Sequence, residues 1–391
     1  MTKITQVEIH EFGFDVPNLG NLTGADSVGA IGYMKGAVSR IEKFALVIIT
    51  EDGCRGEYVT HWCSTPSTCA QAKTLAPKLI GRHAEEREGI YDDMKRELRQ
   101  FDHMGQGPID IALWDWAGKQ LNCSVSVLLG GYRKKLPAYA STYHGDRNGG
   151  LDSKEAFADF AEHCFDLGYR AFKIHGWNEA DAAEEAENVL HVAKTVGHKM
   201  TLMLDPACQL KTFADALYVG KACDEANFFW LEDPYRDSGV SAFSHKRLRE
   251  MLKTPILQTE HIRGLETKCD FLMAGGTDFL RSDPEYDMGI TGAMKISHLA
   301  ESFGVDVEIH ACGPAHRHVM AATRNTNFYE VALVGPDCPN TMAPVYTCGY
   351  SDMIDCIDKD GFVPVPNGIG LGVQYDWNFI NANTTNVSVF E

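Results

Sequence analysis

The chain has 391 residues, of which 44% are hydrophobic and 23% are charged. This balance is typical of a folded globular protein and excludes a disordered or fibrous chain. The length predicts two or three domains, or one large barrel with an attached cap. The net charge of −18, with Arg133-Lys134-Lys135 as the longest basic run, argues against a nucleic-acid partner.

Membrane and secretion signals are missing from the sequence. No apolar run reaches the roughly 20 residues that a membrane helix requires, and residues 1–12 contain no apolar signal core. We therefore expect no membrane partner and a cytoplasmic location. The 12 cysteines are scattered without a Cys-X-X-Cys pair, which is typical of reduced, mostly buried thiols.

The first third of the chain has the patterns of an α+β domain. Alternation in residues 4–12 and the apolar run 44–50 predict two strands of an antiparallel sheet. Residues 68–99 and 105–120 have the periodicity of amphipathic helices. Leu129-Gly130-Gly131 then predicts a domain boundary.

Beyond residue 137, short apolar strands alternate with helix-length polar stretches. Such alternation predicts parallel strands joined by right-handed crossovers. Seven or eight units fit between residues 137 and 350, which favours a (β/α)-barrel. A dinucleotide-binding fold is not supported, because no Gly-X-Gly-X-X-Gly motif follows a strand. The predicted strands are 137–142, 171–175, 201–205, 228–233, 255–260, 279–283 and 307–310.

Nearly every one of these strands ends on an ionisable residue. One such residue is often only a helix cap, but capping does not easily explain six consecutive strands. In a parallel barrel the carboxyl ends of the strands share one face, which holds the active site. The residues at these ends are Lys173 with His175, Asp205, Glu232, Glu260, Asp283 and His310.

Three of these strand ends carry carboxylates. Asp205, Glu232 and Glu260 lie 27 and 28 residues apart, which is one strand–helix unit each. Three converging carboxylates repel one another unless a hard cation lies between them, and an all-oxygen ligand set with open positions suits Mg²⁺. The alternative is three separate salt bridges with lysines of the barrel.

The remaining strand-end residues suit proton transfer. Lys173 and His175 face the same side of their strand, and a cationic lysine helps to keep His175 neutral and able to act as a base. Alternatively, Lys173 is a buried lysine tied to a metal-site carboxylate, and His175 is a packing residue. Asp283 can orient His310 for proton transfer. Glu330, which we expect to end a further strand-like run, can hydrogen-bond a substrate oxygen.

Several longer motifs follow one another along the chain. They are IDIALWDWAGK before LLGG, FKIH, LMLDP, WLEDP, QTEHI, SDPEYDMGITGAMK, EIHA and NGIGLGVQYDW. In the order and spacing of these motifs, the chain resembles the mandelate racemase subgroup of the enolase superfamily from end to end. This resemblance implies an α/β protein with a modified (β/α)₇β TIM-type barrel over residues 135–354. It also implies an α+β capping domain over residues 1–130, completed by residues 355–391.

The same resemblance implies Mg²⁺ bound by the three carboxylates, and removal of a proton α to a carboxylate to give an enediolate that the metal stabilises. It places Asp283 and His310 on the subgroup's Asp–His dyad, and it places Glu330 near the carboxylate of the substrate. It also leads us to expect a homo-oligomer.

Two positions of this chain depart from the pattern of the subgroup. His175 stands where members usually have the second lysine of Lys-X-Lys, and Ala207 stands where asparagine is frequent.

We favour elimination of water from a sugar acid, the expected small-molecule partner, to give a 2-keto-3-deoxy acid. His175 is then the base and His310 the acid, although the roles could be exchanged. Polar groups expected near the site suit hydroxyl groups, and four of them are candidates for substrate binding: Lys35, within a predicted loop over residues 15–36, and Tyr143, His144 and His261.

Three other reactions or roles remain open. One is a racemase or epimerase of a hydroxy or amino acid, with Tyr33, Met34 and Trp62 shaping an apolar pocket. A cycloisomerase is disfavoured, because muconate-type members generally carry lysine rather than histidine after the sixth strand. The last is a metal-binding barrel without catalytic activity. The presence of Lys173, His175, Asp283 and His310 argues against this role.

Overall fold

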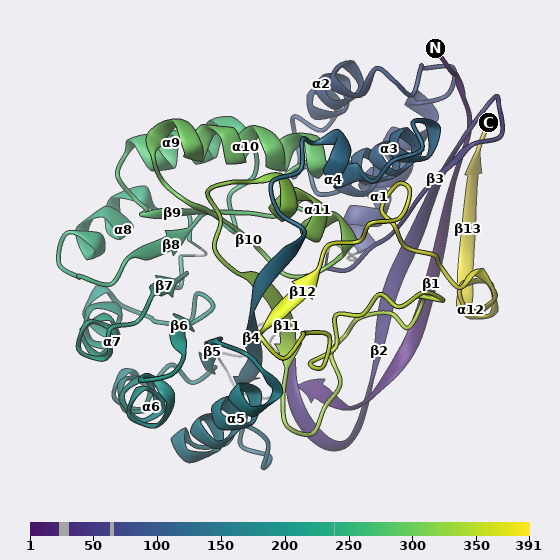
Figure 1. Ribbon diagram of the computed structural model, residues 1–391. Helices are drawn as coiled ribbons and strands as arrows, with labels where there is room; N and C mark the ends of the chain where they lie inside the picture. The colour runs from purple at the N-terminus through teal and green to yellow at the C-terminus, as the bar shows by residue number, and fades with distance from the viewer. Residues whose placement is uncertain (23–30, 63–65, 238) are drawn as a thin grey trace.

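The computed structural model describes residues 1–22, 31–62, 66–237 and 239–391, which form two sheets with their helices (Figure 1). One sheet is antiparallel, in the order β13-β1-β2-β3. The other is mainly parallel, in the order β10-β9-β8-β7-β6-β5-β4-β11. In the part of the chain described, no helix has both the length and the apolar character needed to cross a membrane.

The first two strands of the antiparallel sheet are much longer than predicted. β1 (Ile4–Asn21) pairs with β2 (Ile31–Thr50), and β3 (Arg55–Val59) follows. The prediction of a loop over residues 15–36 is therefore wrong for residues 15–21 and 31–36, and residues 23–30 lie outside the described residues. The alternation that predicts the first strand continues through Phe12, Phe14 and Val16, whose side chains are buried.

The helical stretch predicted over residues 68–99 is divided into separate helices. α1 (Pro66–Leu75) leads into the 3₁₀ turn η1 (Ala76–Lys78), and α2 (Arg87–Glu97) begins after an irregular segment. Pro77 has no amide hydrogen to continue α1, and Gly81 takes a left-handed φ of 79°.

The predicted helix over residues 105–120 is confirmed as α3 (Gln106–Gln120), which the short α4 (Val125–Leu128) follows. Gly56 lets β3 lie directly on α3. A Cβ atom at this position would lie 2.1 Å from the carbonyl oxygen of Ala112.

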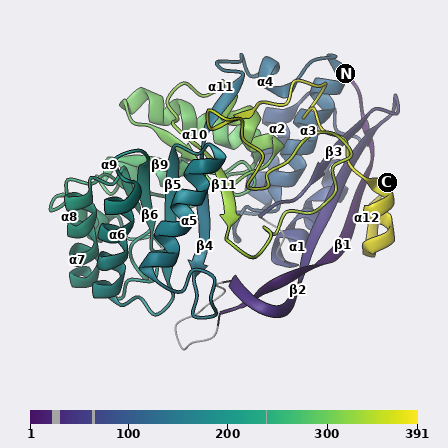
Figure 2. The same cartoon turned by 60° about the horizontal axis from the view of Figure 1, so that its bottom comes forward.

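The parallel sheet forms a nearly closed barrel with its helices outside (Figures 1 and 2). Strand order follows chain order except that β11 pairs with β4, as the (β/α)₇β prediction requires. The elements are β4 (Lys135–Gly145), α5 (Lys154–Leu167), β5 (Ala171–Trp177), α6 (Ala182–Val196), β6 (Thr201–Asp205), α7 (Phe213–Ala226), β7 (Trp230–Glu232), α8 (Ala242–Arg249), β8 (Ile256–Gln258), α9 (Leu265–Met273), β9 (Phe279–Ser282), α10 (Gly289–Phe303), β10 (Val307–Ile309), α11 (Pro314–Ala322) and β11 (Tyr329–Val334).

The C-terminal segment contacts both sheets. β12 (Phe362–Pro364) pairs antiparallel with barrel strand β4, and after α12 (Trp377–Asn383) the last strand β13 (Thr384–Phe390) pairs with β1. Figure 1 shows this yellow segment running from the barrel to the purple strands, near which both termini lie. The final strand thus completes the capping sheet, while the domain boundaries themselves stay a prediction.

A buried glutamate ties the capping sheet to the barrel. Glu285, which follows β9, accepts hydrogen bonds from the Tyr58 hydroxyl (2.7 Å), the His61 amide (2.7 Å) and the Trp62 amide (2.6 Å). Its side chain is fully buried. The three donors belong to β3 and the residues just after it, so Glu285 fixes this end of the cap over the barrel.

Replacing Glu285 with Gln is expected to lower the free energy of unfolding by about 2–3 kcal/mol, because hydrogen bonds to a charged group lose strength and one amide NH₂ then faces a donor. Urea unfolding measures this loss. The matched variant Glu266→Gln removes an exposed glutamate paired with Lys95 and should leave stability nearly unchanged. Equal stability of the two variants would contradict the role of Glu285.

Candidate active site

The ionisable residues predicted at the strand ends gather at one end of the barrel. Asp205 and Glu232 are the last residues of β6 and β7, and Glu260 follows β8. Asp283 and His310 directly follow β9 and β10. The prediction for Glu330 is wrong in one respect. This residue lies near the beginning of β11 and pairs in register with Tyr139 of β4.

Lys173 is the centre of a buried charge cluster. Its Nζ lies 2.8 Å from Glu232 Oε2, 2.9 Å from Glu330 Oε1 and 3.3 Å from Asp205 Oδ2. Burial opposes its charge, but Glu232 and Glu330 raise the pKa of Lys173 well above its usual value. These contacts match the alternative reading of Lys173 as a lysine tied to metal-site carboxylates, and its direct part in catalysis stays a prediction.

Arg281 is a second buried cation, which the sequence analysis missed. Its Nε lies 2.7 Å from Glu232 Oε1, and its Nη2 lies 2.8 Å from Glu330 Oε2. Burial raises the pKa of Glu330, but Lys173 and Arg281 lower it well below its usual value. Arg281 lies within β9, two residues before Asp283. A basic residue inside an otherwise apolar strand is unusual, and this pattern could have indicated Arg281 from the sequence.

Replacing Lys173 with Met is expected to lower the free energy of unfolding by about 3–5 kcal/mol in the presence of a chelator, because buried carboxylates lose their shared cation. Thermal and urea unfolding measure the change. Lys199→Met removes a surface lysine paired with Glu162 and is expected to have little effect. If Lys173→Met loses no more stability than this control, Lys173 does not compensate the negative charge of the buried carboxylates.

His175 directs one ring nitrogen at the carboxylates. Its Nδ1 lies 2.7 Å from the Thr142 carbonyl oxygen, which can only accept a hydrogen bond, so Nδ1 carries the hydrogen. Nε2 then faces the cavity, 3.1 Å from Asp205 Oδ2. This fixed orientation is what a base on β5 requires.

Asp283 and His310 form the predicted pair. His310 Nδ1 donates to Asp283 Oδ2 at 2.7 Å, which leaves Nε2 facing the cavity, 3.4 Å from Glu260 Oε1. Burial lowers the pKa of His310, but Glu260 and Asp283 raise it above its ordinary value overall. His310 therefore takes up a proton more readily than an isolated histidine does.

A second histidine, absent from the sequence predictions, holds the other oxygen of Asp283. His316 Nε2 lies 3.1 Å from Asp283 Oδ1, and the ring is fully buried at the start of α11. Burial raises the pKa of Asp283, but His316 and His310 lower it strongly. The carboxylate is therefore charged and fixed from both sides.

The three carboxylates predicted to bind a metal lie close together. Donor atoms of Asp205, Glu232 and Glu260 all lie within 4.8 Å of one another. With Glu330 nearby, these acids share two permanent cations, Lys173 and Arg281, so the cluster keeps an excess of negative charge. The oxygen-only donor set, its spacing and its charge fit a hard divalent cation.

Five of the predicted site residues, His175, Asp205, Glu260, His310 and Glu330, line a cavity of about 270 Å³ at the mouth of the barrel. Two of the four candidate substrate-binding residues, His144 and His261, line it. Lys35 is exposed on β2, and Tyr143 is buried with its hydroxyl donating to the Pro339 carbonyl, so neither reaches this cavity. The lining residues are Trp62, His144, His175, Asp205, Ala207, Gln209, Asp233, Glu260, His261, Tyr286, His310, Ala311, Glu330, Ala332 and Leu333.

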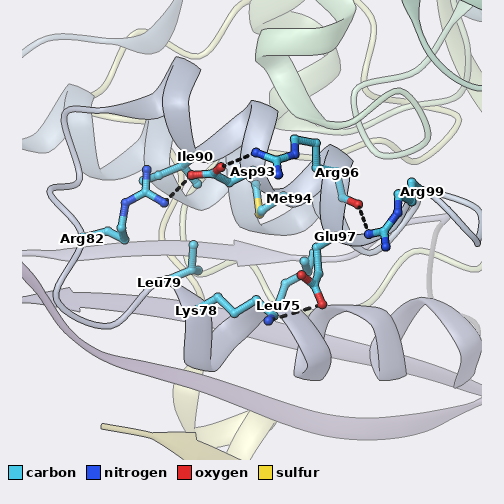
Figure 3. A pocket seen from close by; sticks show the side chains of 10 residues that line it. All are labelled: Leu75, Lys78, Leu79, Arg82, Ile90, Asp93, Met94, Arg96, Glu97 and Arg99. Atoms are coloured by element: carbon cyan, nitrogen blue, oxygen red, sulfur yellow. Dashed lines mark hydrogen bonds and ion pairs between the residues drawn. The ribbon is translucent and has the colours of Figure 1, made fainter.

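Another cavity, of about 290 Å³, lies in the cap between η1 and α2 (Figure 3). Its charged side chains pair with one another across the rim. Arg82 Nη1 lies 2.8 Å from Asp93 Oδ2, and Lys78 Nζ lies 3.3 Å from Glu97 Oε1. Among the described residues, the lining of this cavity contains no histidine, and its two acidic side chains, Asp93 and Glu97, are both ion-paired. We therefore place the chemistry at the mouth of the barrel.

Comparison with known proteins agrees with this site. Residues 34–130 match the N-terminal domain model of mandelate racemase and muconate lactonizing enzyme, and residues 156–379 match the enolase C-terminal domain-like model. The chain therefore belongs to the enolase superfamily, in the branch related to mandelate racemase. This result confirms the family and the fold predicted from the sequence.

The relatives include dehydratases and a racemase. The structure is similar to that of D-glucarate dehydratase from Agrobacterium tumefaciens complexed with magnesium, with a TM-score of 0.84, 30% identity and coverage of 98% of this chain and 99% of that one. Arabinonate dehydratase of Saccharolobus solfataricus is 25% identical over 85% of this chain and 88% of its own. The N-succinyl-L-Arg/Lys racemase of Bacillus cereus is 25% identical over 72% and 74%. The dehydratases agree with the prediction of a lyase.

Proposed function

We propose that this protein is a Mg²⁺-dependent dehydratase of a sugar acid, which produces a 2-keto-3-deoxy acid and works as a homo-oligomer in the cytoplasm. The observation that carries the reaction is the placement of two imidazoles. His175 on β5 and His310 after β10 flank, in strand order, the three carboxylates of β6, β7 and β8. Both direct Nε2 at the cavity. One base and one acid beside a single metal site are what elimination of water requires.

The chain's own residues account for the proton transfers. His175 Nε2 takes the α-proton, and its ring stays oriented through the hydrogen bond from Nδ1 to the Thr142 carbonyl. His310 donates its Nε2 proton to the hydroxyl on the β-carbon as that C–O bond breaks, so the hydroxyl leaves as water. The resulting enol then becomes the 2-keto acid by taking a proton at the β-carbon and releasing the proton of its hydroxyl group.

The remaining polar groups bind and orient the substrate. Mg²⁺ held by Asp205, Glu232 and Glu260 would bind the substrate carboxylate and make the α-proton more acidic. Glu330 lies beside this position, and His144 and His261 line the cavity where sugar hydroxyls would lie. The support for a polyol substrate is this set of hydrogen-bonding groups, together with the relatives that act on arabinonate and glucarate.

Epimerisation of a hydroxy or amino acid is the second candidate, favoured by the racemase relative. The same two imidazoles could exchange a proton on opposite faces of the α-carbon. Of the residues expected to form an apolar pocket for such a substrate, Trp62 lines the cavity, whereas Tyr33 and Met34 lie on β2 outside its lining.

A screen in D₂O separates the two reactions. The protein with Mg²⁺ is incubated with pools of sugar acids, and both 2-keto acid and deuterium incorporation are measured by mass. Formation of a keto acid from one pool supports dehydration, and separating that pool names the substrate. If the substrate gains deuterium and no keto acid forms, the proposal of a dehydratase is wrong and the protein is an epimerase.

A further inference from the structure

A second group of metal-binding side chains lies at the mouth of the barrel. Cys208, Asp233 and His261 follow the strands β6, β7 and β8. Each offers one donor atom, and these three atoms all lie within 4.8 Å of one another. The group shares no residue with the three carboxylates of the proposed Mg²⁺ site, although Asp233 and His261 directly follow two of them in the sequence.

Backbone hydrogen bonds hold two of these residues together before any metal binds. The Cys208 amide donates to the Asp233 carbonyl at 2.7 Å, and the Leu210 amide donates to the Pro234 carbonyl at 3.2 Å. Cys208 and Asp233 also take left-handed φ angles of 60° and 37°. The loops after β6 and β7 therefore pair with each other, and His261 joins them with its Nε2 3.3 Å from Asp233 Oδ2.

The surroundings of the Asp233 carboxylate are a second, independent indication of a metal site. Its side chain is 2% exposed, and within the described residues its carboxylate oxygens have no hydrogen-bond partner apart from the 3.3 Å contact with His261 Nε2. Its ion pair with His261 joins it to another member of the same group. A buried carboxylate is costly unless it is paired or coordinates a metal, and Asp233 and His261 both line the cavity at the mouth of the barrel.

We propose that Cys208, Asp233 and His261 bind Zn²⁺. Thiolate, imidazole and carboxylate are the ligands that Zn²⁺ takes, whereas a thiolate does not suit Mg²⁺. Three protein ligands would leave a fourth position open for water or another small ligand, and two of them, Asp233 and His261, line the cavity. The chain thus has two adjacent cation sites with different metal preferences.

Occupation of this site has a functional consequence, which rests on the proposed dehydration, whereas the binding itself does not. A cation held by Asp233 and His261 occupies the wall of the cavity where the substrate would lie. We therefore expect Zn²⁺ to inhibit turnover in the presence of saturating Mg²⁺, and this inhibition should weaken when Cys208 is replaced.

The test uses Co²⁺ as a spectroscopic probe for Zn²⁺ on the full chain saturated with Mg²⁺. One equivalent of Co²⁺ should produce near-ultraviolet sulfur-to-cobalt charge-transfer absorption, and Zn²⁺ should displace it. Cys208→Ser should abolish this absorption and weaken Co²⁺ binding, measured by calorimetry, by about tenfold or more. The matched control Cys269→Ser changes a partly exposed cysteine on α9 and should keep both signals.

The second variant His261→Asn removes a ligand whose side chain is 36% exposed, and it should also weaken binding. Circular dichroism shows whether each variant is folded. The proposal is overturned if wild-type protein gives no charge-transfer absorption, if Cys208→Ser keeps it, or if Cys269→Ser loses it equally. These readouts need no substrate, so failure of the Zn²⁺ site and failure of the proposed dehydration are distinguishable.

Discussion

Replacing His310 with Asn is expected to reduce formation of the 2-keto acid by about 10²–10⁴-fold, the usual contribution of a positioned acid or base. The asparagine amide can still donate to Asp283, so the carboxylate keeps a hydrogen-bond partner where His310 Nδ1 now lies. The variant loses only the group at Nε2 that faces the cavity. Steady-state turnover with the substrate found in the screen measures the effect.

Exchange of the α-proton in D₂O then assigns the role of His310. Asp283 holds Nδ1 of this residue and leaves Nε2 facing the cavity, which is the geometry that an acid for the leaving hydroxyl requires. We therefore expect His310→Asn to keep α-proton exchange while losing elimination. Loss of exchange as well would make His310 the base. The control His298→Asn changes an exposed histidine on α10, and a turnover equal to that of this control would exclude His310 from catalysis.

The barrel and most of its site could be predicted because they depend on local patterns. Each apolar strand followed by a polar stretch marks one strand–helix unit, and the carboxyl ends of parallel strands meet on one face. The side chains of Asp205, Glu232 and Glu260 converge for this reason alone, without knowledge of any loop. The Asp283–His310 contact follows in the same way, since β9 and β10 are neighbours in the barrel.

What the sequence could not predict depends on register and on contacts between distant segments. Glu330 lies near the start of β11 because β11 pairs with β4, and this register is set by closure of the barrel. Arg281 joins Glu330 across that closure. His316 reaches Asp283 from α11, and no periodicity shows which face of that helix meets the dyad.

The candidate contacts of Lys35 and Tyr143 show a similar limit in the cap. β1 and β2 continue as a long paired ribbon, and the side chain of Lys35 is exposed there instead of lining the cavity. Tyr143 lies near the carboxyl end of barrel strand β4, but its ring packs in a second apolar cluster with Phe12 and Tyr33. A position at a strand end is thus a good predictor of a site residue for charged side chains. It is a weak predictor for an aromatic side chain, because burial of the ring in the core is itself favourable.

Replacing Asp205 with Asn is expected to weaken Mg²⁺ binding and to lower turnover together. Asparagine has the same shape and can still accept from the Ala207 amide, as Asp205 does at 2.7 Å. It lacks the negative charge that draws a divalent cation, however. Since changes outside the ligand set already cost about 10–100-fold in metal affinity, loss of a charged ligand should cost at least that much. Calorimetric titration with Mg²⁺ measures the affinity, and turnover is measured over a range of Mg²⁺ concentrations.

Glu330→Gln is the matched control, because Glu330 is an equally buried carboxylate of the same charge cluster but lies outside the proposed ligand set. It should alter turnover and weaken Mg²⁺ binding less than Asp205→Asn does, because it removes a charge of the cluster but no ligand. If Asp205→Asn binds Mg²⁺ as tightly as the wild type, Asp205 is not a ligand. In that case Asp205 would serve only as an ion-pair partner of Lys173 and His175. The three carboxylates would then form separate salt bridges, which is the alternative to a metal site.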